Sequence, residues 1–250
     1  MINRDRIDLE TYYQSFGIFG KALEDKVNEG LRRIDEGYPL AYLVKEAYFY
    51  DLVFTVDERV LIPRPDTERL CEKAIALLPQ GATFIDLGTG SGCIAVTVLF
   101  HRPDLRGVAV DLSPDALAVA RHNAKRYGVD ERLTFVEGDM KTVIDIGAPY
   151  DLVISNPPYI PTADIADYPS LVHEPQMALD GGEDGMDFYR ALLVGYPSLL
   201  SAEGGFLFEI GFDQGRAIRA LGESLGYTVE VYKDYGKNDR VALLYPEKKR

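Results

Sequence analysis

Hydrophobic and polar positions follow two different periods along this chain, and the change from one to the other predicts its organisation. From Ile7 to Ile34 apolar residues recur at helical spacing, with Gly17 and Gly20 between two stretches. This pattern predicts a short N-terminal helical region over residues 1–45.

Two short runs of β-branched and aromatic residues come next. Residues 47–50 and 52–56 are typical of strands around a tight turn at Asp51. We therefore expect residues 46–64 to form a β-hairpin connector, after which a helix begins within the segment from Pro63 to Glu68.

Beyond residue 82, apolar strands alternate with helices, as in a parallel α/β sheet. Ser113 and Pro114 are typical of an N-cap and a first helical residue, and Gly128 of a helix end. The expected strands are residues 83–87, 108–111, 133–136, 152–155 and 205–210, and the expected helices are residues 93–101 and 114–127.

The last two strands, residues 228–232 and 240–245, are separated by a segment too short for a crossover helix. Parallel neighbours need a longer connection, so this pair is predicted to be an antiparallel hairpin. A seven-stranded, mostly parallel sheet with an antiparallel C-terminal strand fits the class I S-adenosylmethionine-dependent methyltransferase fold better than the six-stranded dinucleotide fold. We assign residues 65–250 to that domain.

The chain is acidic, with 27 Lys and Arg against 40 Asp and Glu and a formal net charge of −13. Affinity for nucleic acid comes mainly from basic side chains that neutralise phosphates. Residues 248–250 are the main basic tract, so nucleic acid is disfavoured as a substrate and a basic protein partner is favoured.

Cys71 and Cys93 are the two cysteines, and they are not in a Cys-x-x-Cys spacing. We therefore expect no disulfide framework and no metal site, which fits a reducing compartment. The first six residues lack the apolar stretch of a signal peptide, and no apolar run approaches the length of a membrane span. We expect a cytoplasmic monomer without membrane association.

The tetrapeptide Asn156-Pro157-Pro158-Tyr159 follows the apolar run 150–155. Both prolines fix φ and lack an N–H, so nearby carbonyls are not used up by ordinary turn bonds. The Asn156 side-chain oxygen and the Pro157 carbonyl are therefore candidates to accept from an incoming NH2 group, and Tyr159 offers a flat face for an amide or a base. This chemistry suits nitrogen methylation. The alternative is a stiff exit from a strand into a loop.

A glycine-rich turn follows the first strand of the sheet and opens a helix; it consists of Gly88, Thr89, Gly90, Ser91 and Gly92. Glycines allow backbone to approach a ligand without Cβ clashes. A pyrophosphate fingerprint requires glycine or alanine at the position of Cys93. The turn therefore favours a ligand without a pyrophosphate, such as S-adenosylmethionine.

Acidic residues end the neighbouring strands. Asp111 is placed to accept from two ribose hydroxyls, with Leu112 against the adenine. Asp139 is placed to accept from the adenine amino group, and the Met140 N–H is placed to donate to a ring nitrogen. Asp86 is placed to fix the glycine turn. The alternative is that these carboxylates are strand ends that face solvent. Their shared position at the carboxyl edge of the sheet, where open α/β sheets bind ligands, favours the cofactor site.

Several segments together resemble the release-factor glutamine N5-methyltransferases of the HemK type: Ile62 to Glu68, Asp86 to Gly92, Asn156 to Tyr159, Glu174-Pro175, Gly181-Gly182 with Gly185, and Glu209-Ile210-Gly211. The tetrapeptide alone is shared with DNA adenine and rRNA guanine methyltransferases, so an amino-methyltransferase of DNA or RNA is the alternative. A catalytically silent binding module is a further alternative.

The resemblance implies that S-adenosylmethionine is the methyl donor and that the glutamine of a Gly-Gly-Gln loop in peptide chain release factors is the substrate. It also implies that Asn156 and the Pro157 carbonyl bind the substrate amide, and that Gly88 to Gly92, Asp111 and Asn156 contact the cofactor. The N-terminal helical region is shorter here than is usual in the family.

An acidic segment follows the tetrapeptide, from Pro161 to Arg190, and is too long for a plain connector. We interpret it as a flap beside the cleft that meets a basic partner, with a solvated loop as the alternative. Arg64 and Glu68 are spaced for an i, i+4 pair on a helix, and the resemblance implies alternatively that their segment borders the cofactor pocket.

Overall fold

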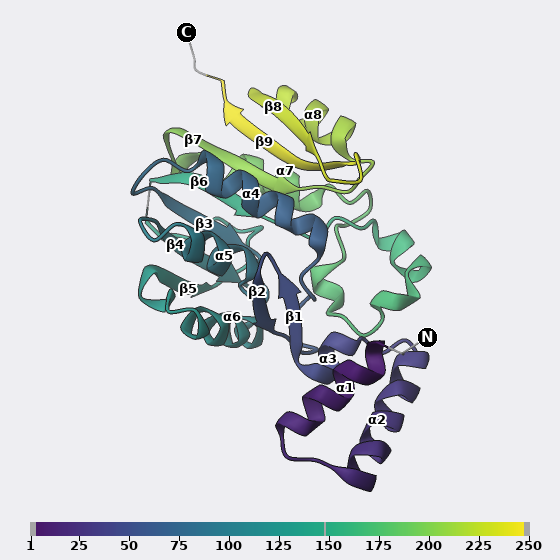
Figure 1. Cartoon of the computed structure of the whole chain (residues 1–250). Coiled ribbons are helices and arrows are strands. Elements are labelled where there is room, and N and C mark those ends of the chain that lie inside the picture. The colour runs from purple at the N-terminus through teal and green to yellow at the C-terminus, as the bar shows by residue number, and fades with distance from the viewer. Residues whose placement is uncertain (1–3, 148, 248–250) are drawn as a thin grey trace.

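The computed structural model describes residues 4–147 and 149–247, so residues 1–3 and the basic tract 248–250 lie outside the described part. A seven-stranded sheet has the strand order β5-β4-β3-β6-β7-β9-β8 (Figure 1). Its strands are β3 (Thr83–Leu87), β4 (Arg106–Asp111), β5 (Leu133–Glu137), β6 (Tyr150–Ser155), β7 (Leu200–Glu209), β8 (Tyr227–Lys233) and β9 (Asp239–Pro246).

The five strands from β5 to β7 pair in parallel, whereas β9 runs antiparallel to both β7 and β8. The predicted C-terminal hairpin and the predicted fold class are therefore confirmed. The antiparallel strand β9 lies second from the edge of the sheet because β8 continues outside it.

Helices cover both faces of the sheet, and successive strand residues point to opposite faces. On one face α4 (Glu68–Leu77), α5 (Cys93–His101) and α6 (Pro114–Arg126) share a core with one set of alternating strand residues. On the other face α7 (Asp187–Gly195) and α8 (Gly215–Ser224) pack on the alternate set. The α6 helix begins as predicted, because the Ser113 side chain accepts from the Ala116 N–H at 3.2 Å.

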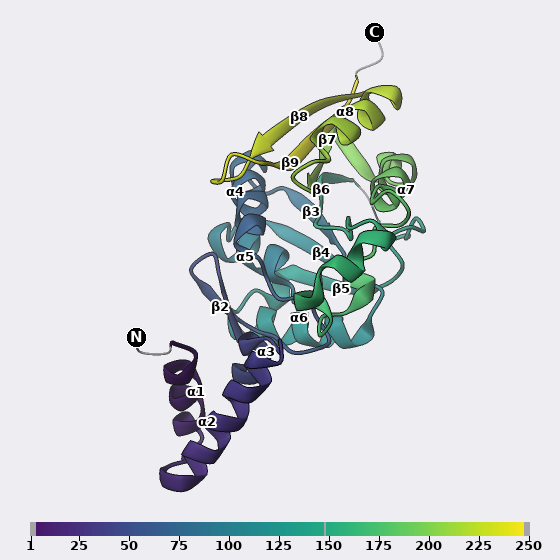
Figure 2. The same cartoon turned by 90° about the vertical axis from the view of Figure 1, so that its right-hand side faces the viewer.

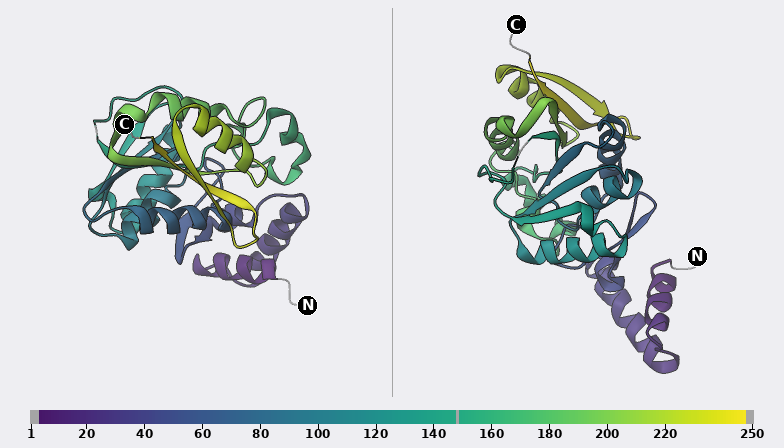
Figure 3. Two further views of the ribbon diagram at one scale, coloured as in Figure 1. Left: turned by 90° about the horizontal axis from the view of Figure 1, so that it is seen from above. Right: turned by 90° about the vertical axis from the view of Figure 1, so that its left-hand side faces the viewer.

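The N-terminal helices have a small core of their own. This region consists of α1 (Arg4–Ser15), α2 (Gly20–Asp35) and α3 (Leu40–Val44), around the buried residues Leu9, Val27 and Leu43. The α1–α2 pair projects from the rest of the molecule, at the opposite end from β8 and β9 (Figures 2 and 3).

A β-hairpin connects these helices to the sheet domain. Its strands are β1 (Glu46–Phe49) and β2 (Leu52–Thr55), and both turn residues, Tyr50 and Asp51, have positive φ (48° and 63°), as a two-residue hairpin turn requires. Side chains of α6 and of the residue that follows it fix β2: Asn123 exchanges two hydrogen bonds with the Thr55 backbone (2.9 and 3.0 Å), and the Tyr127 hydroxyl bonds both the N–H and the carbonyl of Val53.

Short 3-10 helices make up the remaining regular structure: η1 (Pro65–Thr67), η2 (Asp130–Arg132), η3 (Thr162–Asp167), η4 (Pro169–Leu171), η5 (Gln176–Ala178) and η6 (Pro197–Leu199). Three of them lie in one excursion from the sheet, which leaves at Ile160 and returns at Asp180, where the two residues form a parallel β-bridge. Among the helices that the structure describes, none combines the length and the apolar character needed to cross a bilayer.

Candidate functional site

A cavity of about 420 Å³ lies at the carboxyl edge of the sheet. Eight predicted site residues line it: Gly88, Gly90, Asp111, Leu112, Asp139, Met140, Asn156 and Pro158. The other predicted site residues, namely Asp86, Thr89, Ser91, Gly92, Pro157 and Tyr159, are not among the residues that line it. The cavity thus brings residues from the ends of β3, β4, β5 and β6 around one space.

The glycine turn after β3 has a backbone that ordinary residues rarely adopt. Gly88 and Gly90 have φ values of 76° and 54°, and a Cβ at Gly88 would lie 2.9 Å from the Met140 Cε. The N–H groups of Gly88 and Thr89 both donate to the Val110 carbonyl at 2.9 Å. Glycine therefore allows the turn to fold back on β4 and leaves room on the side of the cavity.

Asp111 connects that turn to the start of α6. One carboxylate oxygen accepts from the Gly90 N–H at 2.8 Å and the other from the Ser113 N–H at 2.9 Å. Burial raises the pKa of Asp111, and these backbone hydrogen bonds oppose the rise. Each carboxylate oxygen has a further lone pair, so Asp111 can still accept from hydroxyl groups in the cavity.

Asp86 lies beneath the turn instead of at the cavity wall. It is fully buried, and one of its oxygens accepts from the Thr89 hydroxyl at 2.6 Å. Its Oδ1 has no well-aligned hydrogen-bond partner within the described part of the chain, although the Ala95 N–H lies near enough to lower the pKa of this carboxyl. Burial raises the pKa of Asp86 to about 7, while the hydrogen bond from Thr89 lowers it.

The raised pKa of Asp86 predicts a dependence of stability on pH. An acid whose pKa is higher in the folded state stabilises the fold fully below its unfolded value near 4 and loses that contribution as pH rises through about 7. We expect the Asp86→Asn variant to reduce the fall in unfolding free energy between pH 5 and 8 by at least on the order of 1 kcal/mol. Denaturant unfolding at several pH values measures this, and an unaltered slope would contradict it.

The Asn156 side chain has a fixed orientation at the end of β6. Its NH2 group donates to the Thr67 hydroxyl at 3.2 Å, so the amide oxygen remains available to an incoming donor. The strand end itself is fastened to β3, since the Ser155 hydroxyl donates to the Leu87 carbonyl at 2.5 Å.

Tyr159 is not among the residues that line the cavity. Its hydroxyl donates to the Glu209 carboxylate at 3.3 Å, and its carbonyl accepts from the Gln214 side chain at 3.0 Å. Burial, followed by the charge of Glu209, raises the pKa of the Tyr159 hydroxyl. The structure therefore gives Tyr159 a bracing contact, and the stacking platform inferred from the sequence stays a prediction.

Glycines let the returning end of the excursion pack directly against the tetrapeptide. A Cβ at Gly181 would lie 2.7 Å from the Tyr159 Cα, and one at Gly185 would lie 2.3 Å from the Tyr159 carbonyl oxygen. Any larger residue at these positions would push the two loops apart. Close backbone packing by Gly181 and Gly185 thus holds the tetrapeptide in place at Tyr159.

The acidic segment after the tetrapeptide borders the cavity, and Glu174 anchors it to the segment before η1. The buried Glu174 carboxylate accepts from the Ile62 N–H at 3.0 Å and from the Arg64 guanidinium. The expected Arg64–Glu68 pair is therefore wrong: the Glu68 carboxylate accepts from the Tyr50 N–H instead. Arg64 has extended backbone (φ −102°, ψ 143°) before η1, so no helix brings it over Glu68.

Sequence patterns do not identify the other residues of the cavity wall. They come from the hairpin exit, the loop after β5, the excursion and α7, and include Arg59, Lys141, Thr162, Met177 and Phe188. The Lys141 ammonium lies 4.9 Å from the centroid of the Phe188 ring. The family motif Glu174-Pro175 was the available clue that the excursion reaches the site.

Comparison with known proteins agrees with this geometry. Residues 70–180 match the Methyltransferase small domain family. A release factor glutamine methyltransferase of Chlorobaculum tepidum is 43% identical over 217 residues, spanning 82% of this chain and 74% of the relative. One of Moorella thermoacetica is 42% identical over 222 residues, or 87% of this chain and 78% of the relative.

Among solved structures, the catalytic domain of hMettl16 in complex with an RNA hairpin superposes with a TM-score of 0.65 at 17% identity, covering 78% of this chain and 76% of that one. At that identity the likeness shows the fold alone. The sequence matches go further, since they exceed 40% identity over most of both chains. The chain belongs to the release factor glutamine methyltransferase family.

Proposed function

We propose that this protein transfers a methyl group from S-adenosylmethionine to the side-chain amide nitrogen (N5) of the glutamine in the Gly-Gly-Gln loop of peptide chain release factors. The observation that carries the proposal is the orientation of Asn156. Because its NH2 group is committed to Thr67, its oxygen is the atom left to bind a donor at the cavity wall.

The residues around the cavity fit a sulfonium nucleoside. We propose that Asp111 accepts from the ribose hydroxyls, that Leu112 and Met140 flank the adenine, and that Asp139 accepts from the adenine amino group. The glycine turn from Gly88 to Gly92 would pass beside the ligand without side chains. When bound, the cofactor supplies an electrophilic methyl group on sulfur.

The protein's task in the transfer is to position the amide and to stabilise charge on it. An amide nitrogen is a weak nucleophile because its lone pair is delocalised into the carbonyl. Hydrogen bonds from the substrate NH2 to the Asn156 oxygen and the Pro157 carbonyl would aim the nitrogen and strengthen as it becomes positive. Pro158 and Tyr159 would hold these acceptors rigid.

Transfer of a labelled methyl group tests the proposal. The protein and labelled S-adenosylmethionine are incubated in separate reactions with each of four substrates. These are release factor, release factor whose loop glutamine is replaced by alanine, DNA, and ribosomal RNA. We expect label on the glutamine of the first substrate alone, located by mass spectrometry of peptides. Label on DNA or RNA would favour the amino-methyltransferase alternative, which the net charge of −13 disfavours.

The remaining expectations concern organisation and setting. We propose that residues 1–45 form a helical region and residues 46–64 a connector to the methyltransferase domain of residues 65–250. A monomeric state and a cytoplasmic location stay predictions, to be tested by sedimentation and by fractionation.

A further inference from the structure

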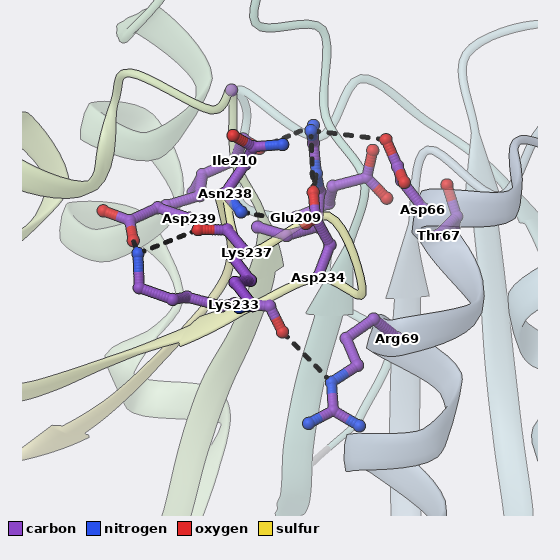
Figure 4. Close-up of polar contacts among 12 residues, drawn as sticks. Asp66, Thr67, Arg69, Glu209, Ile210, Lys233, Asp234, Lys237, Asn238 and Asp239 are labelled. Carbon is purple, nitrogen blue, oxygen red and sulfur yellow. Dashed lines mark hydrogen bonds and ion pairs between the residues drawn. The ribbon is translucent and has the colours of Figure 1, made fainter.

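A buried polar cluster, none of whose members lines the cavity, adjoins Asn156 through Thr67. Its central member is Glu209, at the end of β7, with an exposed fraction of 1%. The Tyr159 hydroxyl donates to one carboxylate oxygen at 3.3 Å, and the other oxygen, Oε2, is buried with no hydrogen-bond partner within the described residues. The Thr67 hydroxyl on η1 lies near enough to lower the pKa of this carboxyl. Figure 4 shows Glu209 between the end of η1, with Asp66 and Thr67, and the loop that carries Asp234.

The hydrogen bonds of this cluster have a direction. The Asn156 NH2 group donates to the Thr67 oxygen at 3.2 Å. A hydroxyl has a single proton, and that of Thr67 is available to the Glu209 carboxylate, whose buried Oε2 has no other partner within the described residues. The chain therefore runs from the Asn156 amide through Thr67 to Glu209, with Glu209 as its acceptor.

We propose that Thr67 and Glu209 are positioning residues that keep the Asn156 amide from turning over, so that its oxygen faces the substrate nitrogen. Without Thr67 and Glu209, the Asn156 amide can turn over. Its NH2 group then faces the substrate NH2 group, and two donors repel each other. The inference deepens the proposed function and depends on it, because it assigns a cause to the orientation that the methyl transfer needs.

The charge of Glu209 controls this chain. An ionised carboxylate can only accept, whereas a protonated one can donate to Thr67 and reverse the direction. Burial raises the pKa of Glu209 to about 7, and hydrogen bonds from Thr67 and Tyr159 and the charge of Arg240 oppose the rise. The titratable and charged groups that face Glu209 from the surrounding elements are Asp66, Cys71, Cys93, Tyr159, Tyr189 and Arg240.

Arg240 itself is shared among several acceptors, so it does not hold Glu209 ionised over the whole pH range. Its guanidinium lies 3.3 Å from a carboxylate oxygen of Asp234, from one of Asp66 and from the Ile210 carbonyl. We therefore expect the rate of methyl transfer to rise with pH through about 7, as Glu209 loses its proton.

Single-turnover methyl transfer to release factor by the full-length protein tests the role of Thr67. The Thr67→Val variant keeps the shape and loses the hydroxyl; we expect its rate to fall roughly 10- to 100-fold, with cofactor affinity within about twofold. Thr67→Ser should restore the rate to within about threefold. The matched control is Thr97→Val, the same change at a buried hydroxyl in α5 that has no partner within the described residues.

The pH profile tests the role of Glu209. The Glu209→Gln variant should show no rise between pH 6 and 8, whereas the rise should persist in Asp86→Asn, which removes the other buried acid of similar pKa. A rise that survives in Glu209→Gln, or an unchanged rate in Thr67→Val, would overturn the inference. Failure of the unaltered protein to methylate release factor would instead overturn the proposed function.

Discussion

Replacing Asn156 by alanine is expected to lower the rate of methyl transfer roughly 1000-fold while cofactor affinity stays within about threefold. The side-chain oxygen is the acceptor for the substrate NH2 group, and that hydrogen bond strengthens as the nitrogen becomes positive. Loss of this hydrogen bond therefore raises the free energy of the transition state and leaves the free energy of cofactor binding little changed. Single-turnover rates with labelled cofactor measure the first effect, and equilibrium binding of the demethylated cofactor measures the second.

The control is Asn28→Ala, the same deletion at an exposed position on α2. It should leave the rate of the chemical step unchanged, and melting temperatures of both variants show whether the fold is intact. A rate in Asn156→Ala within tenfold of the unaltered protein, with the fold intact, would contradict the acceptor role.

The Asp111→Asn variant is expected to bind the cofactor roughly 100-fold more weakly, which corresponds to about 2.7 kcal/mol. One carboxylate oxygen becomes an NH2 group, which faces a backbone N–H of either Gly90 or Ser113. The glycine turn then loses a charge-assisted hydrogen bond, and the ribose loses part of its acceptor. Titration calorimetry with the demethylated cofactor measures the affinity.

Asp115→Asn is the matched control for this variant, because Asp115 lies nearby in the first turn of α6 and is exposed. It should bind the cofactor with unchanged affinity. Equal loss of affinity in both variants would point to a general effect of charge and would contradict the specific role of Asp111.

Local rules were enough to predict the seven strands of the sheet and the helices α4, α5 and α6, whereas α7 and α8 were not predicted. Ser113 and Pro114 predicted the start of α6, and the short segment between the last two strands predicted the antiparallel β9, because both depend on neighbours in sequence. The carboxyl edge of a parallel sheet is likewise a property of the topology, so Asp111 and Asn156 were predicted to border one site, and both line the cavity.

Contacts between residues far apart in sequence were not predictable in the same way. Arg64 was expected to pair with Glu68, four residues on, but contacts Glu174, 110 residues away. Thr67 was not recognised as a partner of Asn156, since nothing in either local sequence specifies that two loops bring a hydroxyl and an amide together. Side-chain direction depends on packing, and packing is known once the whole chain is folded.

The anchor at Glu174 divides the excursion between Ile160 and Asp180 into two parts that differ in their surroundings. The later part, from residue 175, borders the cavity together with Thr162 at the start of the excursion, whereas the stretch between them carries exposed apolar side chains such as Val172. Because Glu174 holds the excursion between these parts, we expect a substitution before Glu174 to alter the position of the residues after it little. We therefore expect that the exposed stretch around Val172 can be exchanged or lengthened to change the substrate range while the cavity stays intact.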